Sequence, residues 1–242
     1  NLSSSDGTNI IKASSGSDNN LFYGLNLNGS QSMDLIYILN SKNNTFYNFN
    51  FVKSNGYSIL LQYSDDNVFY KGNINSAISY GVYLESGLRN TFSSVNFKGL
   101  NSVVYSVFSI NTSIMDSTFD PTYKMTLSSS GGSSAYLVNS THLKSFENIL
   151  AGTTFYNGWY LDLSVNNNSG AALSNANINA YNSVGSLAYS GLTDVQGKNR
   201  AILYEYSNIG GVTSYYSSYI LNVSKTGYPA SSQSLNMSGN KN

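Results

Sequence analysis

The sequence NTFYNFNF at 44–51 returns as NVFYKGNI at 67–74 and again as NTFSSVNF at 90–97. Each copy has Asn, one residue and Phe, and after four more residues another large apolar side chain. The copies start about 23 residues apart, and a fixed period of this length is typical of a solenoid, whose stacked repeats share one core. The pattern predicts about five turns, because a weaker copy precedes these three (Asn20, Phe22, Leu27) and a degenerate one follows (Thr112, Ile114, Phe119).

The segment before each Asn alternates between apolar and other residues, as expected of a strand with one buried face. One face carries the pairs Ile36 and Ile38, Ile59 and Leu61, and Val82 and Leu84, and the other face carries Tyr37, Leu60 and Tyr83. Two strands per repeat with polar turns between them describe one coil of a parallel β-helix.

The segments from Asn55 (NGYSILLQYSDDNVFYKGNI) and from Gly81 (GVYLESGLRNTFSSVNF) resemble coils of right-handed parallel β-helix proteins of the pectin-lyase-like superfamily, in particular the copper-maturation periplasmic type of repeat. The resemblance covers roughly the first 150 residues. It implies rungs about 4.8 Å apart, with a Phe column in the core and an Asn column forming an amide ladder in a turn. Identical neighbouring amides can satisfy one another because each offers two donors and an acceptor.

A different pattern begins near Trp159, after the period breaks beyond Phe119. It resembles the carboxypeptidase-regulatory-like, transthyretin-like family of β-sandwiches in four places: Gly170, Asn175–Ile178, Thr193–Gly197 and Tyr219–Tyr228. The prediction is an all-β chain: a short right-handed parallel β-helix at 1–155 and an immunoglobulin-like, transthyretin-like β-sandwich at 156–242.

The composition supports strands and excludes several classes of partner. Tyr and Phe number 21 and 11, and Asn, Ser and Gly, which are poor in helix interiors, dominate the polar residues. Charged residues are only 10% with a net charge of zero, so we expect no nucleic acid partner. The chain has no Cys, no apolar run of membrane-spanning length and no signal-peptide pattern. We therefore expect no membrane-spanning segment, no metal site and no cofactor.

Low charge with abundant Asn, Ser, Thr and Tyr resembles secreted surface proteins, above all archaeal ones, so we expect an extracellular location at a cell surface. The start at Asn1 rather than Met suggests a processed or excised segment. Asn-x-Ser/Thr sequences are about as frequent as chance predicts, and they make glycosylation candidates of Asn28, Asn43, Asn111, Asn139, Asn167, Asn222 and Asn236.

The candidate binding residues are Tyr23, Tyr47 and Tyr70, each of which directly follows a Phe of the repeat. They should therefore face outward and form a column of aromatic rings. This column either stabilises the stacked rungs or binds sugars or proteins.

The charged residues offer little for catalysis. The register places Lys42 beside Asp65 and Asp66 beside Arg89, which favours ion pairs between rungs over a catalytic or calcium site. Glu85 has no second carboxylate in register. The pair Asp116 and Asp120 favours a role in a turn over a sugar site, and the single histidine, His142, favours a structural role. We expect no catalytic residue.

The sequence thus predicts a non-catalytic, extracellular structural or adhesive protein that self-associates into a surface layer, sheath or filament. The alternative is a β-helix protein that binds or cleaves carbohydrate, as a polysaccharide lyase or hydrolase would. A third interpretation is a fragment of a larger surface protein in which both domains are scaffolding.

Overall fold

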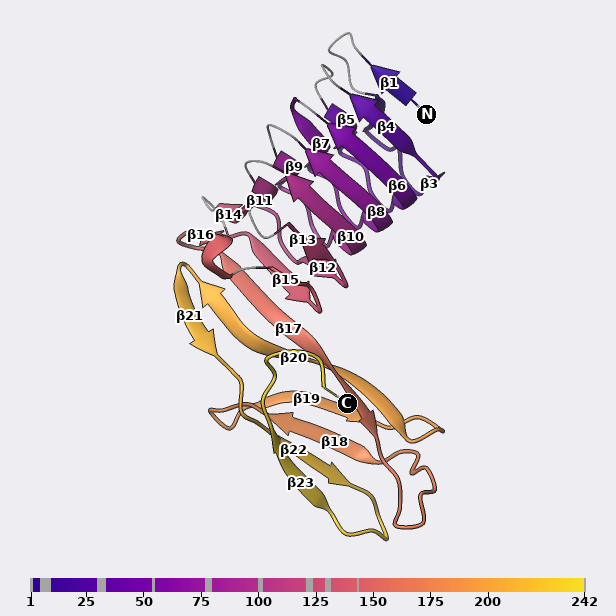
Figure 1. Cartoon of the computed structure of the whole chain (residues 1–242), viewed down its shortest axis with the longest axis vertical. Helices are drawn as coiled ribbons and strands as arrows, with labels where there is room; N and C mark the ends of the chain where they lie inside the picture. Colours follow the sequence, from indigo (N-terminus) through magenta and orange to yellow (C-terminus); the bar gives the residue numbers. More distant parts are fainter. Residues whose placement is uncertain are drawn as a thin grey trace. The chain divides into compact units, whose positions relative to one another are not determined.

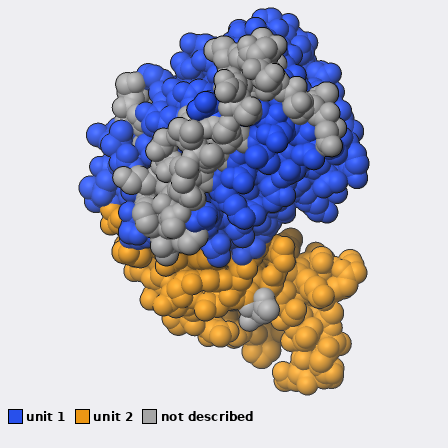
Figure 2. Space-filling view, turned by 45° about the horizontal axis from the view of Figure 1, so that its top comes forward, with its two compact units in different colours: residues 1–155, 208–212 blue, residues 156–207, 213–242 orange. Residues whose placement is uncertain are grey.

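The chain is all-β in a computed structural model that describes residues 2–4, 10–29, 34–53, 55–76, 80–99, 102–120, 124–128, 132–142 and 144–241. These residues form strands and one short 3-10 helix, η1 (Lys144–Phe146) (Figure 1). The chain divides into two compact units, residues 1–155 with 208–212 and residues 156–207 with 213–242 (Figure 2).

The first unit is a β-solenoid of about five turns, as the repeat predicts. One parallel sheet follows the order β1-β4-β6-β8-β10-β12-β15, with β3 paired to β6 and β13 to β10. Its strands are β1 (Leu2–Ser4), β3 (Leu21–Tyr23), β4 (Asn26–Gly29), β6 (Thr45–Lys53), β8 (Val68–Ser76), β10 (Thr91–Gly99), β12 (Thr112–Met115), β13 (Thr118–Phe119) and β15 (Ser134–Val138).

A second parallel sheet lies behind the first in Figure 1 and follows the order β16-β14-β11-β9-β7-β5-β2. Its strands are β2 (Ile11–Ser14), β5 (Asp34–Leu39), β7 (Tyr57–Gln62), β9 (Tyr80–Glu85), β11 (Ser102–Val107), β14 (Lys124–Ser128) and β16 (Glu147–Ile149). Each turn of the solenoid therefore contributes one strand to each sheet.

The register matches the sequence period residue for residue. Phe46 pairs with Phe69 and Phe69 with Phe92, and the rings of successive rungs stack with centroids 4.6 and 5.0 Å apart. All three side chains are fully buried. The predicted inner positions of the second sheet, such as Ile59 and Val82, are buried as well, so the core lies between the two sheets.

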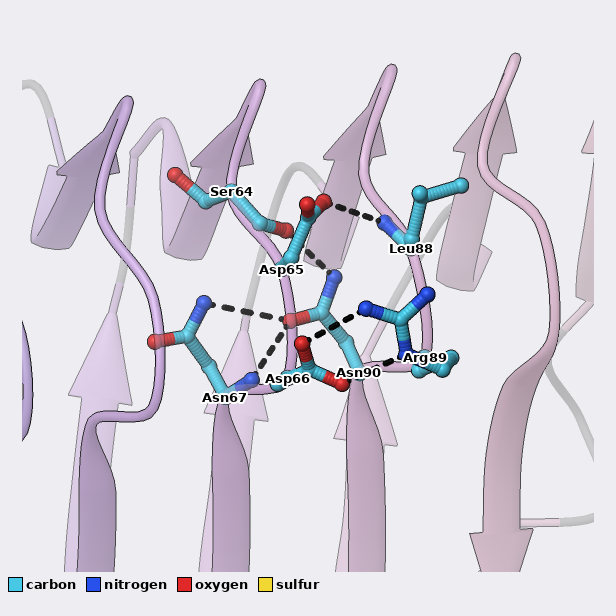
Figure 3. A network of polar contacts seen from close by, with 7 residues as sticks. All are labelled: Ser64, Asp65, Asp66, Asn67, Leu88, Arg89 and Asn90. Carbon is cyan, nitrogen blue, oxygen red and sulfur yellow. Dashed lines mark hydrogen bonds and ion pairs between the residues drawn. The ribbon is translucent and has the colours of Figure 1, made fainter.

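The predicted amide ladder is confirmed. Asn44 Nδ2 donates to Asn67 Oδ1 at 3.1 Å, and Asn67 Nδ2 donates to Asn90 Oδ1 at 3.2 Å. The backbone N–H groups of Asn44 and Asn67 also donate to the amide oxygen of the next rung. Buried polar groups are costly unless they are hydrogen-bonded, and this ladder satisfies three fully buried amides with one another and with backbone. Figure 3 shows the step from Asn67 to Asn90.

The solenoid turns corners at residues in the left-handed backbone conformation. One column precedes the ladder, and its φ values are 57° at Asn43, 54° at Asp66 and 53° at Arg89. A second column bends the long strands of the first sheet, with φ values of 57° at Asn48 and 54° at Lys71. Asn and Asp tolerate this conformation because their short side chains can hydrogen-bond locally. The second bend also explains how Phe46, Phe49 and Phe51 can all point into the core.

The second unit is built mainly of antiparallel strands. Four of them form a sheet in the order β19-β18-β22-β23. The strands of this part of the chain are β17 (Thr154–Ser164), β18 (Asn177–Tyr181), β19 (Leu187–Leu192), β20 (Lys198–Ile209), β21 (Val212–Tyr215), β22 (Tyr219–Ser224) and β23 (Ser231–Leu235).

Two groups of strands contribute side chains to the core of the second unit: β17 with β20, and the four-stranded sheet. Leu161 and Leu203 from the first pair meet Ile178 and Tyr219 from the sheet in one buried cluster. The Tyr219 hydroxyl group donates to the Tyr204 carbonyl oxygen at 2.7 Å, so the buried phenol is not left without a partner.

Candidate functional site

Among the described residues, the outer side of the second sheet carries five tyrosines, Tyr37, Tyr57, Tyr80, Tyr83 and Tyr105, which we call the tyrosine face. Tyr83 pairs in register with Tyr105, and Leu60 lies between Tyr37 and Tyr83 in the same row. All five side chains are half-buried. Alternation along the strand turns Tyr37, Tyr83 and Tyr105 outward, because both neighbours of each are buried. Tyr57 and Tyr80 each come before two consecutive buried residues, where this alternation is interrupted.

Four of these rings pack against one another across adjacent rungs. The ring centroids are 4.8 Å apart for Tyr57 and Tyr83, 5.3 Å for Tyr83 and Tyr105, and 4.7 Å for Tyr80 and Tyr105. Their hydroxyl groups have no hydrogen-bond partner within the described ranges of the chain. The cluster therefore combines apolar ring surface with unused donors and acceptors.

A hydrogen-bonded chain of polar side chains crosses the same face. The Tyr37 hydroxyl group donates to Gln62 Oε1 at 2.6 Å, and Gln62 Nε2 donates to Glu85 Oε2 at 2.6 Å. Gln62 and Glu85 are partners in register on β7 and β9. Because Gln62 uses its oxygen for one neighbour and its nitrogen for the other, its orientation is fixed, and it holds Glu85 in place.

Burial and nearby carboxylates raise the pKa of three phenols of this face. Burial first, and Glu85 second, raise the pKa of Tyr83 above its ordinary value. For Tyr37 and Tyr57 burial again comes first, followed by Asp34, in raising the pKa. The phenols of Tyr37, Tyr57 and Tyr83 therefore remain hydrogen-bond donors well into the alkaline range.

The binding residues predicted from the sequence were Tyr23, Tyr47 and Tyr70, none of which belongs to the tyrosine face. The sequence does contain a signal for this face, because Tyr57 and Tyr80 are 23 residues apart, which is the period of the repeat. These two tyrosines lie outside the Asn-Phe motif from which the other tyrosines were predicted. Tyr83 was expected on the face opposite the apolar residues, but not as part of a cluster with Tyr57, Tyr80 and Tyr105.

The structure places Tyr23, Tyr47 and Tyr70 in one column on the outside of the first sheet. The ring centroids of Tyr23 and Tyr47 are 5.3 Å apart, and those of Tyr47 and Tyr70 are 5.2 Å apart. Lys71 Nζ lies 5.6 Å from the centre of the Tyr47 ring and 5.2 Å from that of Tyr70. Tyr23 is 68% exposed at the end of the column. A lysine thus covers part of this column, whereas the tyrosine face holds a carboxylate.

One of the two expected ion pairs forms. Arg89 binds Asp66 through two hydrogen bonds of 2.7 Å, and these bonds lower the pKa of Asp66 below its ordinary value (Figure 3). Asp65 instead accepts the backbone N–H of Leu88 at 2.8 Å. Asp65 therefore satisfies a backbone donor in the turn of the neighbouring rung.

A shallow hollow lies at the turn between the sheets, lined by Gly16, Asp18, Asn40, Ser41, Lys42, Tyr63 and Asp65. It brings two carboxylates and one ammonium group beside an exposed tyrosine. One carboxylate oxygen of Asp18 accepts the Lys42 backbone N–H at 2.7 Å, so Asp18 caps its neighbouring rung as Asp65 does.

The remaining polar candidates have structural partners. Asn139 donates to Asp116 in the preceding rung at 2.6 Å, and Asp120 donates its backbone N–H to Phe97. His142 Nε2 lies 2.6 Å from Glu147 Oε1, and the ring packs edge-on against Phe119. His142 therefore has a structural partner in Glu147, and the contact is largely shielded from solvent.

The candidate glycosylation residues differ in accessibility. Asn28, Asn43, Asn111, Asn222 and Asn236 are exposed. Asn139 and Asn167 are half-buried, and the Asn139 amide nitrogen is used by Asp116. Asn167 has its amide oxygen bonded to backbone N–H groups of its own turn.

Within the described residues there is no group of three or more His, Cys, Asp or Glu side chains that could hold a metal ion. The same part of the chain contains no helix that is long and apolar enough to cross a membrane.

No protein-family model matches the chain. No curated protein matches it either. Among solved structures, it is similar to the enzymatically active domain of tailspike protein 2 of bacteriophage CBA120, with 8% sequence identity and a TM-score of 0.38. The alignment covers 90% of this chain and 56% of that one, so this chain spans a little over half the length of the matched domain.

The expectation of a protein without enzymatic activity needs correction. The matched tailspike domain is described as enzymatically active, which goes against that expectation, and we no longer count the chain among non-enzymes. At this level of similarity the match assigns no reaction, substrate or residue role to the chain.

Proposed function

We propose that this chain is a carbohydrate-binding β-solenoid and that the tyrosine face contacts the sugar. The observation that carries the proposal is the combination of four packed tyrosine rings with the chain from Tyr37 through Gln62 to Glu85 on one face of one rigid sheet.

Sugars present apolar C–H surfaces and hydroxyl groups in alternation. A binding site for them needs apolar area for the first and fixed donors and acceptors for the second. Tyrosine supplies both, because its ring is apolar and its hydroxyl group donates and accepts. Gln62 and Glu85 add acceptors whose positions are set in the unbound protein, which reduces the entropy lost on binding.

The test is a pair of matched double variants. Tyr83→Ala with Tyr105→Ala removes adjacent stacked rings from the tyrosine face. Tyr47→Ala with Tyr70→Ala removes adjacent rings from the column on the first sheet. Binding to a panel of polysaccharides is measured by affinity electrophoresis and calorimetry, and circular dichroism and thermal unfolding check that each variant folds.

Loss of binding in the Tyr83 and Tyr105 variant alone, by about tenfold or more, supports the proposal. Loss only in the Tyr47 and Tyr70 variant would move the site to the first sheet and overturn its placement. A wild-type protein that binds no polysaccharide rejects the function.

Cleavage of a bound polysaccharide is a second candidate, favoured by the hollow that brings Asp18, Lys42 and Asp65 together beside Tyr63. Carboxylates with a nearby base are the groups that glycosidic bond cleavage requires. The same polysaccharide panel, assayed for new reducing ends and unsaturated products, tests it. Activity that survives Asp18→Asn and Asp65→Asn would place the reaction elsewhere.

Self-association at a cell surface is also proposed, with the partner a second copy of this chain. Strand β19, LAYSGL, ends the order of its sheet and contains neither charged residues nor Pro, which commonly protect edge strands from pairing. Leu187 and Leu192 on it are exposed. Light scattering over a concentration series should show association that Leu187→Lys with Leu192→Lys reduces; a wild type that stays monomeric throughout rejects it.

We propose further that the second unit is a transthyretin-like β-sandwich and that the protein is extracellular. Two residues that carry the resemblance support the sandwich, since Thr193 and Asp194 hold the turn before β20 through bonds to Ala176 and Lys198.

The extracellular location is tested separately. Recovery of the intact chain from the outer surface of the source cells, with sugar on Asn28 or Asn222, would support the location. Recovery only from the cytoplasm would reject it.

A further inference from the structure

The tyrosine face carries more negative than positive charge. Glu85 lies within it, and Asp34 lies beneath it, where its carboxylate accepts the Tyr57 backbone N–H at 3.1 Å. Among the side chains that the structure describes, the positive group in contact with the face is Lys12, whose Nζ lies 5.4 Å from the centre of the Tyr37 ring, at the end of the row.

Glu85 is held ready to accept a hydrogen bond from a ligand. Its Oε2 receives the Gln62 amide, and its Oε1 receives no hydrogen bond from the described residues. It follows Tyr83 by two positions on β9 and so points to the same side of the sheet. A sugar that packs on Tyr83 and Tyr105 is therefore within reach of the Glu85 carboxylate.

An ionised carboxylate is an acceptor only, so it needs a donor from the ligand. Sugar hydroxyl groups supply donors. The carboxylate of a uronic acid supplies none, and at this distance it repels Glu85 across a half-buried surface where solvent screens weakly.

We propose that the tyrosine face selects glycans free of acidic groups, with Glu85 as the residue that sets this selectivity by accepting a sugar hydroxyl group. This inference rests on the proposed carbohydrate-binding function. It excludes polyuronates as ligands of this surface.

The experiment compares each neutral polysaccharide that binds with its C6-oxidised form, in which the same backbone carries carboxylates. Wild-type protein should bind the oxidised form at least about tenfold more weakly at low salt. Glu85→Gln keeps the shape and removes the charge, and it should bring the two affinities to within about threefold of each other. About 1 M salt, where the Debye length is about 3 Å, should shrink the wild-type preference as well.

Asp194→Asn is the matched control, since it removes one negative charge from the second unit, where Asp194 holds a turn. It should leave the preference unchanged. Equal wild-type affinity for neutral and oxidised forms overturns the inference, and so does a preference that Glu85→Gln does not alter. A wild type that binds no member of the panel instead rejects the proposed function itself.

Discussion

Asn67 is the residue on which the amide ladder depends most. It accepts two hydrogen bonds from Asn44 and gives two to Asn90, and all three amides are fully buried. Removing Asn67 leaves buried donors of Asn44 without an acceptor, which costs far more than the net gain from an intact bond.

Asn67→Ala should lower the free energy of unfolding by on the order of 2–4 kcal/mol. Asn73 provides the matched control, because it belongs to a second, exposed amide ladder in which Asn96 Nδ2 donates to its Oδ1 at 3.4 Å. Asn73→Ala should cost less than about 0.5 kcal/mol. Urea unfolding followed by circular dichroism measures both, and equal losses would contradict a special role for the buried ladder.

The Asp66–Arg89 pair gives a prediction about pH. The bonds from Arg89 lower the pKa of Asp66 below its ordinary 3.8 in the folded state. A carboxyl group of this kind stabilises the fold above its unfolded pKa, and the contribution disappears as the pH falls through the lower, folded-state pKa.

Asp66→Asn should therefore be less stable than wild type at pH 6. The difference should shrink as the pH falls below the ordinary pKa of 3.8 and vanish once the pH is below the lowered, folded-state pKa. The difference should be small, because the Asp66 side chain is 33% exposed and solvent screens the pair. Thermal unfolding from pH 2 to 6 measures it. A difference that persists at pH 2 would show that shape rather than charge is responsible.

At the scale of the element, Phe49 and Gly72 show how neighbouring strands fit together. They pair in register on β6 and β8, and the same position on β10 holds Val95. A Cβ atom on Gly72 would lie 2.3 Å from the Phe49 ring, so the glycine makes room for the aromatic side chain. Phe49 is 3% exposed and stacks on Phe51 with ring centroids 4.6 Å apart.

Gly72→Val should destabilise the solenoid by about 1–3 kcal/mol through overpacking. Phe49→Val should cost about 2–4 kcal/mol through the space it leaves. The double variant places Val in three successive rungs. Its loss of unfolding free energy should be smaller than the sum of the losses in the two single variants. Simple additivity in a double-mutant cycle would show that the two side chains do not share this space.

At the scale of the whole molecule, the solenoid should lose its structure from its N-terminal end. Its rungs contact mainly their neighbours, so an internal rung is held on two sides and the first rung on one. Phe46 and Phe69 lie between paired strands, whereas β3, which contains Phe22, pairs only with β6 among the described strands.

Hydrogen exchange should show the backbone amides of Phe46, Phe69 and Phe92 protected at least about tenfold more than that of Phe22. Mass spectrometry of peptic fragments from native protein measures this directly. Uniform protection from β3 to β10 would indicate that the solenoid opens as one cooperative unit instead.

The sequence alone determined the solenoid, because its core consists of the same side chains at the same place in every rung. The 23-residue spacing of Asn44, Asn67 and Asn90 predicts the register, the amide ladder and the buried Phe column, and all three are found. The residue type at each position of the repeat is enough to predict its contact, because each residue stacks on the equivalent residue one turn away.

Only the tertiary structure revealed the tyrosine face. Tyr57 and Tyr83 belong to neighbouring strands and to different positions of the repeat, and they meet because the side chains of adjacent rows lean together on the surface. The hydrogen bonds that link Tyr37, Gln62 and Glu85 likewise join three rungs through contacts that a linear pattern does not record. A period in the sequence specifies which residues stack, but side-chain direction and burial decide which of those stacks offers a surface to a ligand.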